Sequence, residues 1–409
     1  MIIIGVNMTK KGYQSLDVSG SMGRRDFLKA GTVASAGLVL GNPAIWARNR
    51  QNQTERIKTN VSDVLKIPRT VHSLPGPFPG KVVEVHDPSA TTDDKPVPES
   101  VNAMFDKGLN ALTGKSPRDA FSLFFTPDDV IGIKVNPVGA GLISTHLEVV
   151  DSIIDWLVSC GMQRQNIIIW DRFDYMLDDA GFTPERYPGV AIEGLQTMDE
   201  DAASGKKEDN SRWLKEDGTH VSVNNFDRDV FYWADIEGPK DMPYLNQHVF
   251  NGKHSYFGKL VTQKLTKIIN VPVFKNTGNG VSMATKNLGY GAVCNTNRLH
   301  KPLFFDVNVE VMAFPTLRDK VVLNITDGLR GQYDGGPSAA PQFAYTHNRL
   351  YFATDAFASD RICHDQIIAK RKETGITVNE HPRFTEYFRY AEKLGLGVGD
   401  PQKINHIVV

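Results

Sequence analysis

Cysteine is scarce in this 409-residue sequence, and its spacing argues against several kinds of site. The three cysteines, Cys160, Cys294 and Cys363, stand far apart and form no Cys-x-x-Cys pair. This argues against a zinc ribbon and against a thioredoxin-like redox site. A four-cysteine iron–sulfur cluster is also not expected, because a single chain with three thiolates cannot supply it. We expect all three cysteines to be buried structural residues.

An excess of charge of one sign is missing as well. The formal net charge is −1 at pH 7, with 41% hydrophobic and 23% charged residues, which is typical of a soluble globular protein. Without an excess of basic residues to suit a phosphate backbone, nucleic acid is not an expected partner. The His-Glu-x-x-His and Gly-x-Ser-x-Gly motifs are absent, so zinc peptidases and α/β-hydrolases lack their signatures here.

The sequence has only one long apolar run, near its start. Ala30 to Gly41 are apolar or small, but a stable membrane span takes roughly 20 apolar residues. The run follows Arg24-Arg25 and Phe27-Leu28-Lys29, a pattern typical of a twin-arginine export signal. We expect residues 1–47 to be a signal peptide cut after Ala47, with an uncleaved anchor as the alternative. The twin-arginine translocase would then deliver the folded protein to the periplasm, with no stable membrane span after cleavage.

The remaining chain is predicted to form one α/β domain. Residues 48–80 are polar and then proline-rich, which indicates an extended lead-in. A single domain is expected over 81–409, interrupted by an irregular insertion at about 189–255 that includes a hairpin around 221–233. Other strands are expected over 81–85, 266–274, 320–326 and 349–354, and helices over 101–112, 305–313, 357–370 and 384–394.

One βαβ unit decides the class of the fold. A β-branched strand over 130–135 is followed by Thr145 and Glu148 in capping-box spacing, so a helix should start at His146. Gly161 should end that helix, and a buried strand follows over 166–170. Strands joined through a helix are parallel. We therefore predict a mostly parallel sheet with flanking helices.

Polar residues follow the ends of the predicted strands, where open parallel sheets bind their ligands. Each could also simply cap a helix or solvate a loop. These strand-end residues are Lys134, Asn136, Asp171, Arg172, Lys275, Asn276, Asp327, Arg330 and Asp355.

Three lysines at one sheet edge indicate an anionic ligand. Lys134, Lys275 and Lys286 would repel one another unless a carboxylate or phosphate lay between them. The turns Gly139-Ala140-Gly141 and Gly278-Asn279-Gly280 could bring backbone amides to such an anion. Two ordinary flexible turns are the alternative.

The turn from Gly139 to Ser144 also comes close to a dinucleotide-binding fingerprint. It follows a predicted strand and precedes a predicted helix, and Asp171 follows the next strand, where the fingerprint has an acidic residue. It departs from the fingerprint because Ser144 stands in place of the third glycine and Pro137 lies in the connection. Nucleotide binding is therefore an alternative.

Acid–base and metal chemistry have their own candidates. His300 is the histidine that we expect to transfer protons. Asp360 and His364 lie four residues apart in an expected helix, so they could reach one ion or pair with each other at the surface.

The order of several motifs resembles the domain-of-unknown-function 362 family, over about Val130 to Lys370. The motifs are Val130 to Asn136, Ser144-Thr145-His146, Asn166 to Arg172, Ile269 to Lys275, Thr285 to Gly289, His300, Thr326-Asp327-Gly328 and Thr354 to Asp360.

The resemblance implies a set of site residues but no established activity. Many members of the family that this chain resembles carry a ferredoxin-like cysteine cluster. This chain lacks that cluster, so the resemblance does not imply an electron-transfer role. The implied residues are Lys134, Lys275, Lys286, Asn287, His300, Asp327, Asp355 and Asp360.

We expect an exported enzyme that binds an anionic small molecule. In this hypothesis Lys275, Lys286 and His300 are catalytic, and Asp327, Asp355 and Asp360 hold a divalent metal or orient the lysines. One alternative is a non-catalytic periplasmic cofactor-binding or maturation protein, and another is a nucleotide-dependent oxidoreductase. The remaining ligand-binding candidates are Lys134, Asn136, Gly139, Gly141, Gly278, Gly280, Asn287 and Arg330.

Overall fold

The computed structural model describes residues 57–197, 221–237, 249–250, 252–278, 280–300 and 303–409. The twin-arginine motif, the apolar run and the expected cleavage position lie outside these ranges. Across the described ranges, no helix has the length and apolar character needed to cross a membrane.

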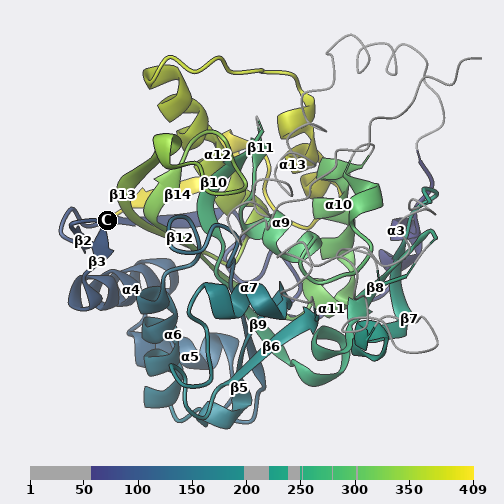
Figure 1. Cartoon of the computed structure of the whole chain (residues 1–409), viewed down its shortest axis with the longest axis horizontal. Helices are drawn as coiled ribbons and strands as arrows, with labels where there is room; N and C mark the ends of the chain where they lie inside the picture. The colour runs from purple at the N-terminus through teal and green to yellow at the C-terminus, as the bar shows by residue number, and fades with distance from the viewer. Residues whose placement is uncertain (1–56, 198–220, 238–248, 251, 279, 301–302) are drawn as a thin grey trace, which may run out of the picture.

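A ten-stranded, mostly parallel sheet forms the centre of the molecule (Figure 1). Its strand order is β14-β1-β13-β12-β9-β4-β5-β6, and β10 pairs with both β11 and β12. Of the strands on the main path, β13 alone runs antiparallel to both of its neighbours. The strands are β1 (Lys81–His86), β4 (Ile131–Lys134), β5 (Ile167–Phe173), β6 (Ala191–Gln196), β9 (Lys267–Asn270), β10 (Val273–Thr277), β11 (Gly280–Val281), β12 (Val321–Gln332), β13 (Ala344–Ala353) and β14 (Asn405–Val408).

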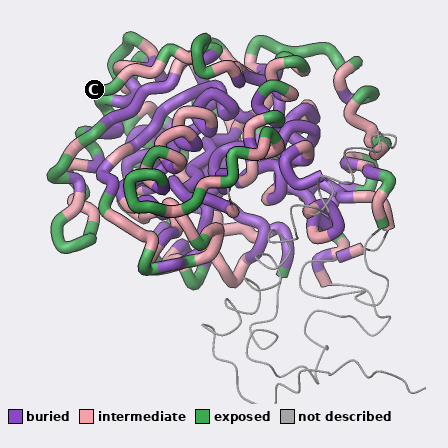
Figure 2. The backbone as a smooth tube through the Cα atoms, turned by 90° about the horizontal axis from the view of Figure 1, so that it is seen from above, coloured by how far each residue is buried: buried purple, intermediate pink, exposed green. Residues whose placement is uncertain are grey.

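Helices cover both faces of this sheet, so its strands are apolar on both sides. In β4, Ile131 and Ile133 pack into one core, whereas in β5 Ile168 and Trp170 pack into the other. Figure 2 shows the resulting buried interior, with the exposed segments at the periphery. One face carries α4 (Pro98–Thr113), α5 (Pro117–Phe124) and α6 (Leu147–Ser159); the other carries α9 (Ala284–Gly289), α10 (Phe304–Glu310), α12 (Ala356–Glu373) and α13 (Arg383–Lys393).

Smaller elements lie outside the central sheet. The paired strands β7 and β8 are antiparallel, so the hairpin expected around 221–233 uses a second strand beyond that range. These elements are α3 (Val61–Val64), β2 (Thr91–Thr92), β3 (Lys95–Pro96), α7 (Asp174–Asp179), β7 (Phe226–Trp233), β8 (His254–Gly258) and α11 (Pro315–Arg318).

The predicted fold class is confirmed, and two predictions about strands need correction. The single strand expected over 266–274 is two strands, β9 and β10, separated by Val271 and Pro272. Proline has no N–H to donate to a ladder, which favours the break. The region expected as an insertion from residue 189 begins inside the sheet, because β6 pairs with β5 in parallel.

The predicted capping box at the start of α6 is wrong. The N-cap residue is His146, and no side-chain hydrogen bond caps the helix. The Thr145 hydroxyl instead accepts the Asn136 N–H at 2.9 Å and donates to the Val271 carbonyl at 2.8 Å. Thr145 therefore joins the ends of β4 and β9. Gly161 has a φ of 99°, as expected for the residue that ends this helix.

The described part of the lead-in is held to the domain by hydrogen bonds from two arginines, the buried Arg318 and the exposed Arg69. Arg318 of α11 donates to the carbonyls of Ile67 and Pro68 at 3.1 and 2.8 Å. Arg69, which belongs to the lead-in, donates to the carbonyls of Leu394 and Gly395 in the domain. Apart from the short helix α3, the segment is extended or turned, as its composition predicts.

Candidate anion-binding site

The order in which the chain adds strands to the sheet reverses between β4 and β9. Open α/β sheets bind their ligands at such a topological switch point. The chain runs from β4 outward to β5 and β6, and then returns to place β9 on the opposite side of β4. The carboxyl ends of β4, β5, β9 and β12 therefore meet at one edge. Most of the side chains predicted from strand ends lie there.

Lys134, the last residue of β4, is buried, and its ammonium group is surrounded by polar partners. Its ammonium forms an ion pair with Asp171 of β5 and donates to the Asn287 side chain at 3.0 Å. It also lies 5.4 Å from the centroid of the Trp170 ring. Burial lowers the pKa of Lys134, and the charge of Asp171 opposes that effect. Lys134 and Asp171 thus neutralise each other inside the sheet edge.

A buried row of amides continues from Lys134 across the sheet. Asn287 donates to Asn270 at 2.8 Å, and Asn270 donates to Asn324 at 2.9 Å. Asn324 in turn faces the carbonyl groups at the end of β13. Sequence analysis missed Asn270 and Asn324, although a single Asn inside an apolar strand pattern is a signal that could have found them. The row fixes α9 against β9 and β12.

Lys275 is held by oxygens of the loop that joins β4 to α6. Its ammonium donates to Asn136 Oδ1 at 2.9 Å and to the carbonyls of Val138 and Ile143 at 2.7 and 3.2 Å. Burial, together with the neighbouring charges of Lys286 and Lys134, moves the pKa of Lys275 well below its usual value. Its three donors are therefore occupied by the protein itself.

The carbonyl groups on either side of the glycine turn in this loop, those of Val138 and Ile143, face Lys275. Gly139 and Gly141 both have positive φ, at 92° and 79°, and the amides of Leu142 and Ile143 bond back to the Gly139 carbonyl. Carbonyl oxygens in this position suit a cation. The sequence predicts the opposite, a cradle of backbone amides for an anion or a dinucleotide. Gly278 and Gly280 flank the turn between β10 and β11, and the Gly278 carbonyl accepts from Arg371 at 3.1 Å.

Lys286 differs from the other two lysines because it lacks a polar partner. Its ammonium lies 5.7 Å from the Tyr290 ring and 5.6 Å from the Phe304 ring. Among the described residues it forms no hydrogen bond or ion pair, and the side chain is partly exposed. Burial lowers its pKa to about 8.

His300 lies beside Lys286 with a defined tautomer. Its Nδ1 lies 3.0 Å from the Thr296 carbonyl, so Nδ1 carries the proton and Nε2 carries the lone pair. Burial and the charges of Lys286 and Arg172 lower the pKa of His300 to about 3. Arg172 itself bonds to the Thr296 hydroxyl at 2.6 Å.

Positive groups outnumber carboxylates in this region. The basic groups lie close enough for Lys134 and Lys286 to lower the pKa of Lys275. Among the described carboxylates, Asp171 raises the pKa values of Lys134, Arg172 and Lys275. Because Asp171 is already paired with Lys134, positive charge remains in excess. We call the four basic residues Lys134, Arg172, Lys275 and Lys286, together with the neutral ring of His300 beside them, the cationic cluster.

The three carboxylates expected to hold a metal each accept N–H groups of the protein. Asp355 caps α12 and also accepts the amides of Gly80 and Val398. Asp360 accepts the Ala284 and Thr285 amides and the Thr285 hydroxyl, which fixes the start of α9. Within the described ranges, no group of three or more His, Cys, Asp or Glu residues could hold a metal ion.

Other candidates also lie elsewhere. Asp360 and His364 do not pair, because His364 Nδ1 lies 3.1 Å from Asp365 instead. Arg330 pairs with the exposed Asp94 at 3.1 Å. All three cysteines are free; Cys294 and Cys363 are buried as expected, and Cys160 is partly exposed.

A histidine–aspartate pair is a further feature of this sheet edge that sequence analysis missed. Asp327 is fully buried, and its Oδ2 accepts both the backbone N–H of His146 at 2.7 Å and its Nδ1 at 2.8 Å. Burial would lower the pKa of His146, but the charge of Asp327 outweighs this and raises it. The sequence around His146 does not indicate this partner, because Asp327 lies on a strand 181 residues away.

We expect Asp327→Asn to lower the pKa of His146 by at least about one unit, because the adjacent charge is removed. The ring C–H resonances of His146 in an NMR titration measure this. The raised pKa of wild-type His146 stabilises the fold fully below the unfolded value of about 6.5, and that contribution is lost as pH rises through the folded value. Glu148 also raises this pKa and Arg330 lowers it, so both stay unchanged in the variant. An identical titration of His146 in Asp327→Asn and in the control variant Asp87→Asn, whose carboxylate is partly exposed and bonds to Ser89, would contradict the pairing.

Comparison with known proteins places the chain in a family without assigning an activity. No curated protein matches the sequence. The family model described as domain of unknown function (DUF362) matches residues 131–365, which is more than half of the chain and includes the cationic cluster and the His146–Asp327 pair. The chain therefore belongs to the DUF362 family of domains of unknown function.

Proposed function

We propose that the protein is an enzyme that binds a small anionic compound, a carboxylate or a phosphate, at the cationic cluster. The observation that carries this proposal is the unpartnered ammonium of Lys286, next to Lys275, Arg172 and His300. An anion would give Lys286 the partner that the described residues do not supply. It would also offset the excess positive charge of the cluster.

The three lysines have different roles in this proposal. Lys134 and Lys275 form the wall, because their donors are taken by Asp171, Asn287 and the β4–α6 loop. Lys286 makes the direct contact with the ligand. Asp360 acts through the start of α9, which it holds in place and which carries Lys286.

His300 would accept a proton at Nε2. In the free protein it is a weak base, since its pKa is about 3. A negative ligand next to the ring favours the imidazolium form, so binding itself would raise this pKa toward the working range. Proton transfer would thus depend on the presence of the ligand.

We expect Lys286→Gln to weaken anion binding at least tenfold, because it removes the cation without enlarging the site. Isothermal titration calorimetry with inorganic phosphate and with succinate measures the affinity. Binding by the wild-type protein should weaken as pH rises past about 8, where Lys286 loses its proton. Lys264→Gln removes an equal charge from an exposed ion pair with Glu193 and should leave the affinity unchanged. Equal affinities in both variants would refute the site.

Chemical conversion of the bound compound distinguishes an enzyme from the non-catalytic alternative. A compound that is retained stoichiometrically and released unchanged would favour a binding or maturation protein. The nucleotide-dependent alternative has less support, because carbonyl groups that flank the turn at Gly139 face Lys275, whereas a bound pyrophosphate needs backbone amides there. The twin-arginine motif supports a location in the periplasm, and we propose that binding takes place there.

A further inference from the structure

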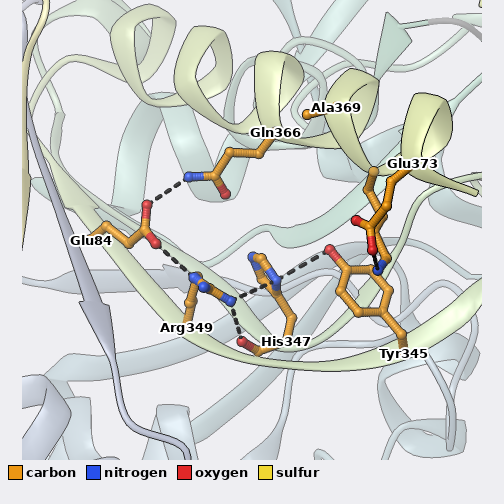
Figure 3. A pocket seen from close by; sticks show the side chains of 8 residues that line it. Glu84, Tyr345, His347, Arg349, Gln366, Ala369 and Glu373 are labelled. Atoms are coloured by element: carbon orange, nitrogen blue, oxygen red, sulfur yellow. Dashed lines mark hydrogen bonds and ion pairs between the residues drawn. The ribbon is translucent and has the colours of Figure 1, made fainter.

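A pocket of about 330 Å³ opens between the first half of β13 and the second half of α12 (Figure 3). It shares no residue with the cationic cluster. Its volume lies at the lower end of the range of roughly 300–1,000 Å³ for sites that bind small molecules. We call it the β13–α12 pocket.

One wall of the β13–α12 pocket is a closed ring of hydrogen bonds. Arg349 joins Glu84 at 2.6 Å and His347 Nδ1 at 3.2 Å. Tyr351 completes the ring, because it contacts both His347 Nε2, at 2.7 Å, and Gln366. Gln366 returns to Glu84 at 2.6 Å. The ring links β1, β13 and α12, so the wall is positioned before any ligand arrives.

The acceptors in this wall are already used. Burial would raise the pKa of Glu84, but hydrogen bonds from His406, Gln366 and Arg349 lower it to about 2. Burial and the charge of Arg349 lower the pKa of His347 to about 3, so its ring is neutral and its Nδ1 accepts. Figure 3 shows Glu84, Gln366, Arg349 and His347 directed toward one another.

Donors, in contrast, remain available. Arg349 uses Nε and Nη1 in the ring, and its Nη2 has no hydrogen-bond partner among the described residues. Among the described residues, Lys370 on α12 forms an ion pair with Glu373 alone, at 3.1 Å, and the Glu373 side chain is 67% exposed. An exposed pair of this kind is weak and easily displaced. The pocket therefore suits a ligand that accepts hydrogen bonds and carries negative charge.

The remaining wall is aromatic. The Tyr345 ring lies beside Lys370, whose ammonium is 5.3 Å from the ring centroid. Ala369 of α12 adds a small apolar surface. Tyr345 lines the same pocket as Arg349 and Lys370, and its ring offers a surface on which a flat aromatic ring can pack.

From this arrangement we propose that the β13–α12 pocket binds a small aromatic carboxylate. The carboxylate contacts Arg349 and Lys370, and the ring lies on Tyr345. The proposal does not depend on the cationic cluster, which lies on other elements.

The test uses benzoate as the probe and isothermal titration calorimetry as the measurement. All variants carry Lys286→Gln, so that binding at the cationic cluster is weakened equally in every comparison. Lys370→Gln should weaken benzoate binding roughly fivefold or more, because a facing charge is lost. Glu373→Gln should tighten it, because the carboxylate that competes for Lys370 is removed. Structural damage would not produce that opposite sign.

Matched controls complete the test. Lys372→Gln removes an exposed charge on the same helix, paired with Glu380, and should leave benzoate binding unchanged. Acetate should bind more weakly than benzoate if Tyr345 provides the surface for the ring. The proposal is overturned if Lys370→Gln and Glu373→Gln leave the benzoate affinity equal, or if inorganic phosphate displaces benzoate at the same concentration.

Discussion

Replacing Asp355 by alanine is expected to lower the free energy of unfolding by about 3 kcal/mol or more. The carboxylate is fully buried and accepts four backbone amides, from Phe357, Ala358, Gly80 and Val398. Losing a helix cap costs about 1 kcal/mol, and each further buried donor left unsatisfied costs about 1–3 kcal/mol. Urea unfolding followed by circular dichroism measures the loss.

The matched control for this prediction is another N-cap aspartate. Asp400 caps a short exposed 3₁₀-helix through one bond to Gln402, at 3.1 Å, so Asp400→Ala should cost about 1 kcal/mol or less. A chelator tests the competing idea of a metal at Asp355. If EDTA destabilised the wild-type protein as much as the Asp355→Ala substitution does, the role assigned here to the backbone amides would be wrong.

Replacing Asp171 by asparagine is expected to destabilise the protein by about 3–5 kcal/mol. The change leaves the Lys134 ammonium buried without its counter-ion and adjacent to the charge of Lys275. Removing one member of a buried ion pair has this magnitude in general, because the remaining charge is uncompensated. Thermal and urea unfolding of the variant measure the effect.

The double variant Lys134→Met with Asp171→Leu separates the pair from its surroundings. Because neither charge remains, its cost should be smaller than the sum of the two single changes. The exposed pair of Lys264 and Glu193 serves as the reference, and Glu193→Gln there should cost about 1 kcal/mol or less. A loss below about 1 kcal/mol for Asp171→Asn would mean that Lys134 does not need its carboxylate.

Local pattern was sufficient to predict the class of the fold. The strand over 130–135, the helix ended by Gly161 and the strand over 166–170 are β4, α6 and β5, and their parallel pairing follows from the helix that connects them. Element ends were less predictable. Thr145 has the spacing of a capping residue, yet its hydroxyl bonds across β4 and β9, because the fold places other backbone groups within its reach.

The site was predictable to the extent that strand ends define it. Lys134, Asp171 and Asn287 come together as a strand-end argument expects. The sequence could not separate a lysine whose donors are filled, such as Lys275, from one with open donors, such as Lys286. Both follow or approach predicted strand ends, and the oxygens that occupy Lys275 belong to a loop more than 130 residues away.

The sequence by itself determined that this chain builds an α/β domain with lysines at one edge of its sheet, because periodicity and chain connectivity are local properties. Only the tertiary structure decided which charged groups are satisfied. Asp355 and Asp360 accept backbone amides, Asp327 holds His146, and Lys286 is left with aromatic neighbours. The physical reason is that a buried charge is defined by the atoms around it, and strands distant in sequence supply those atoms.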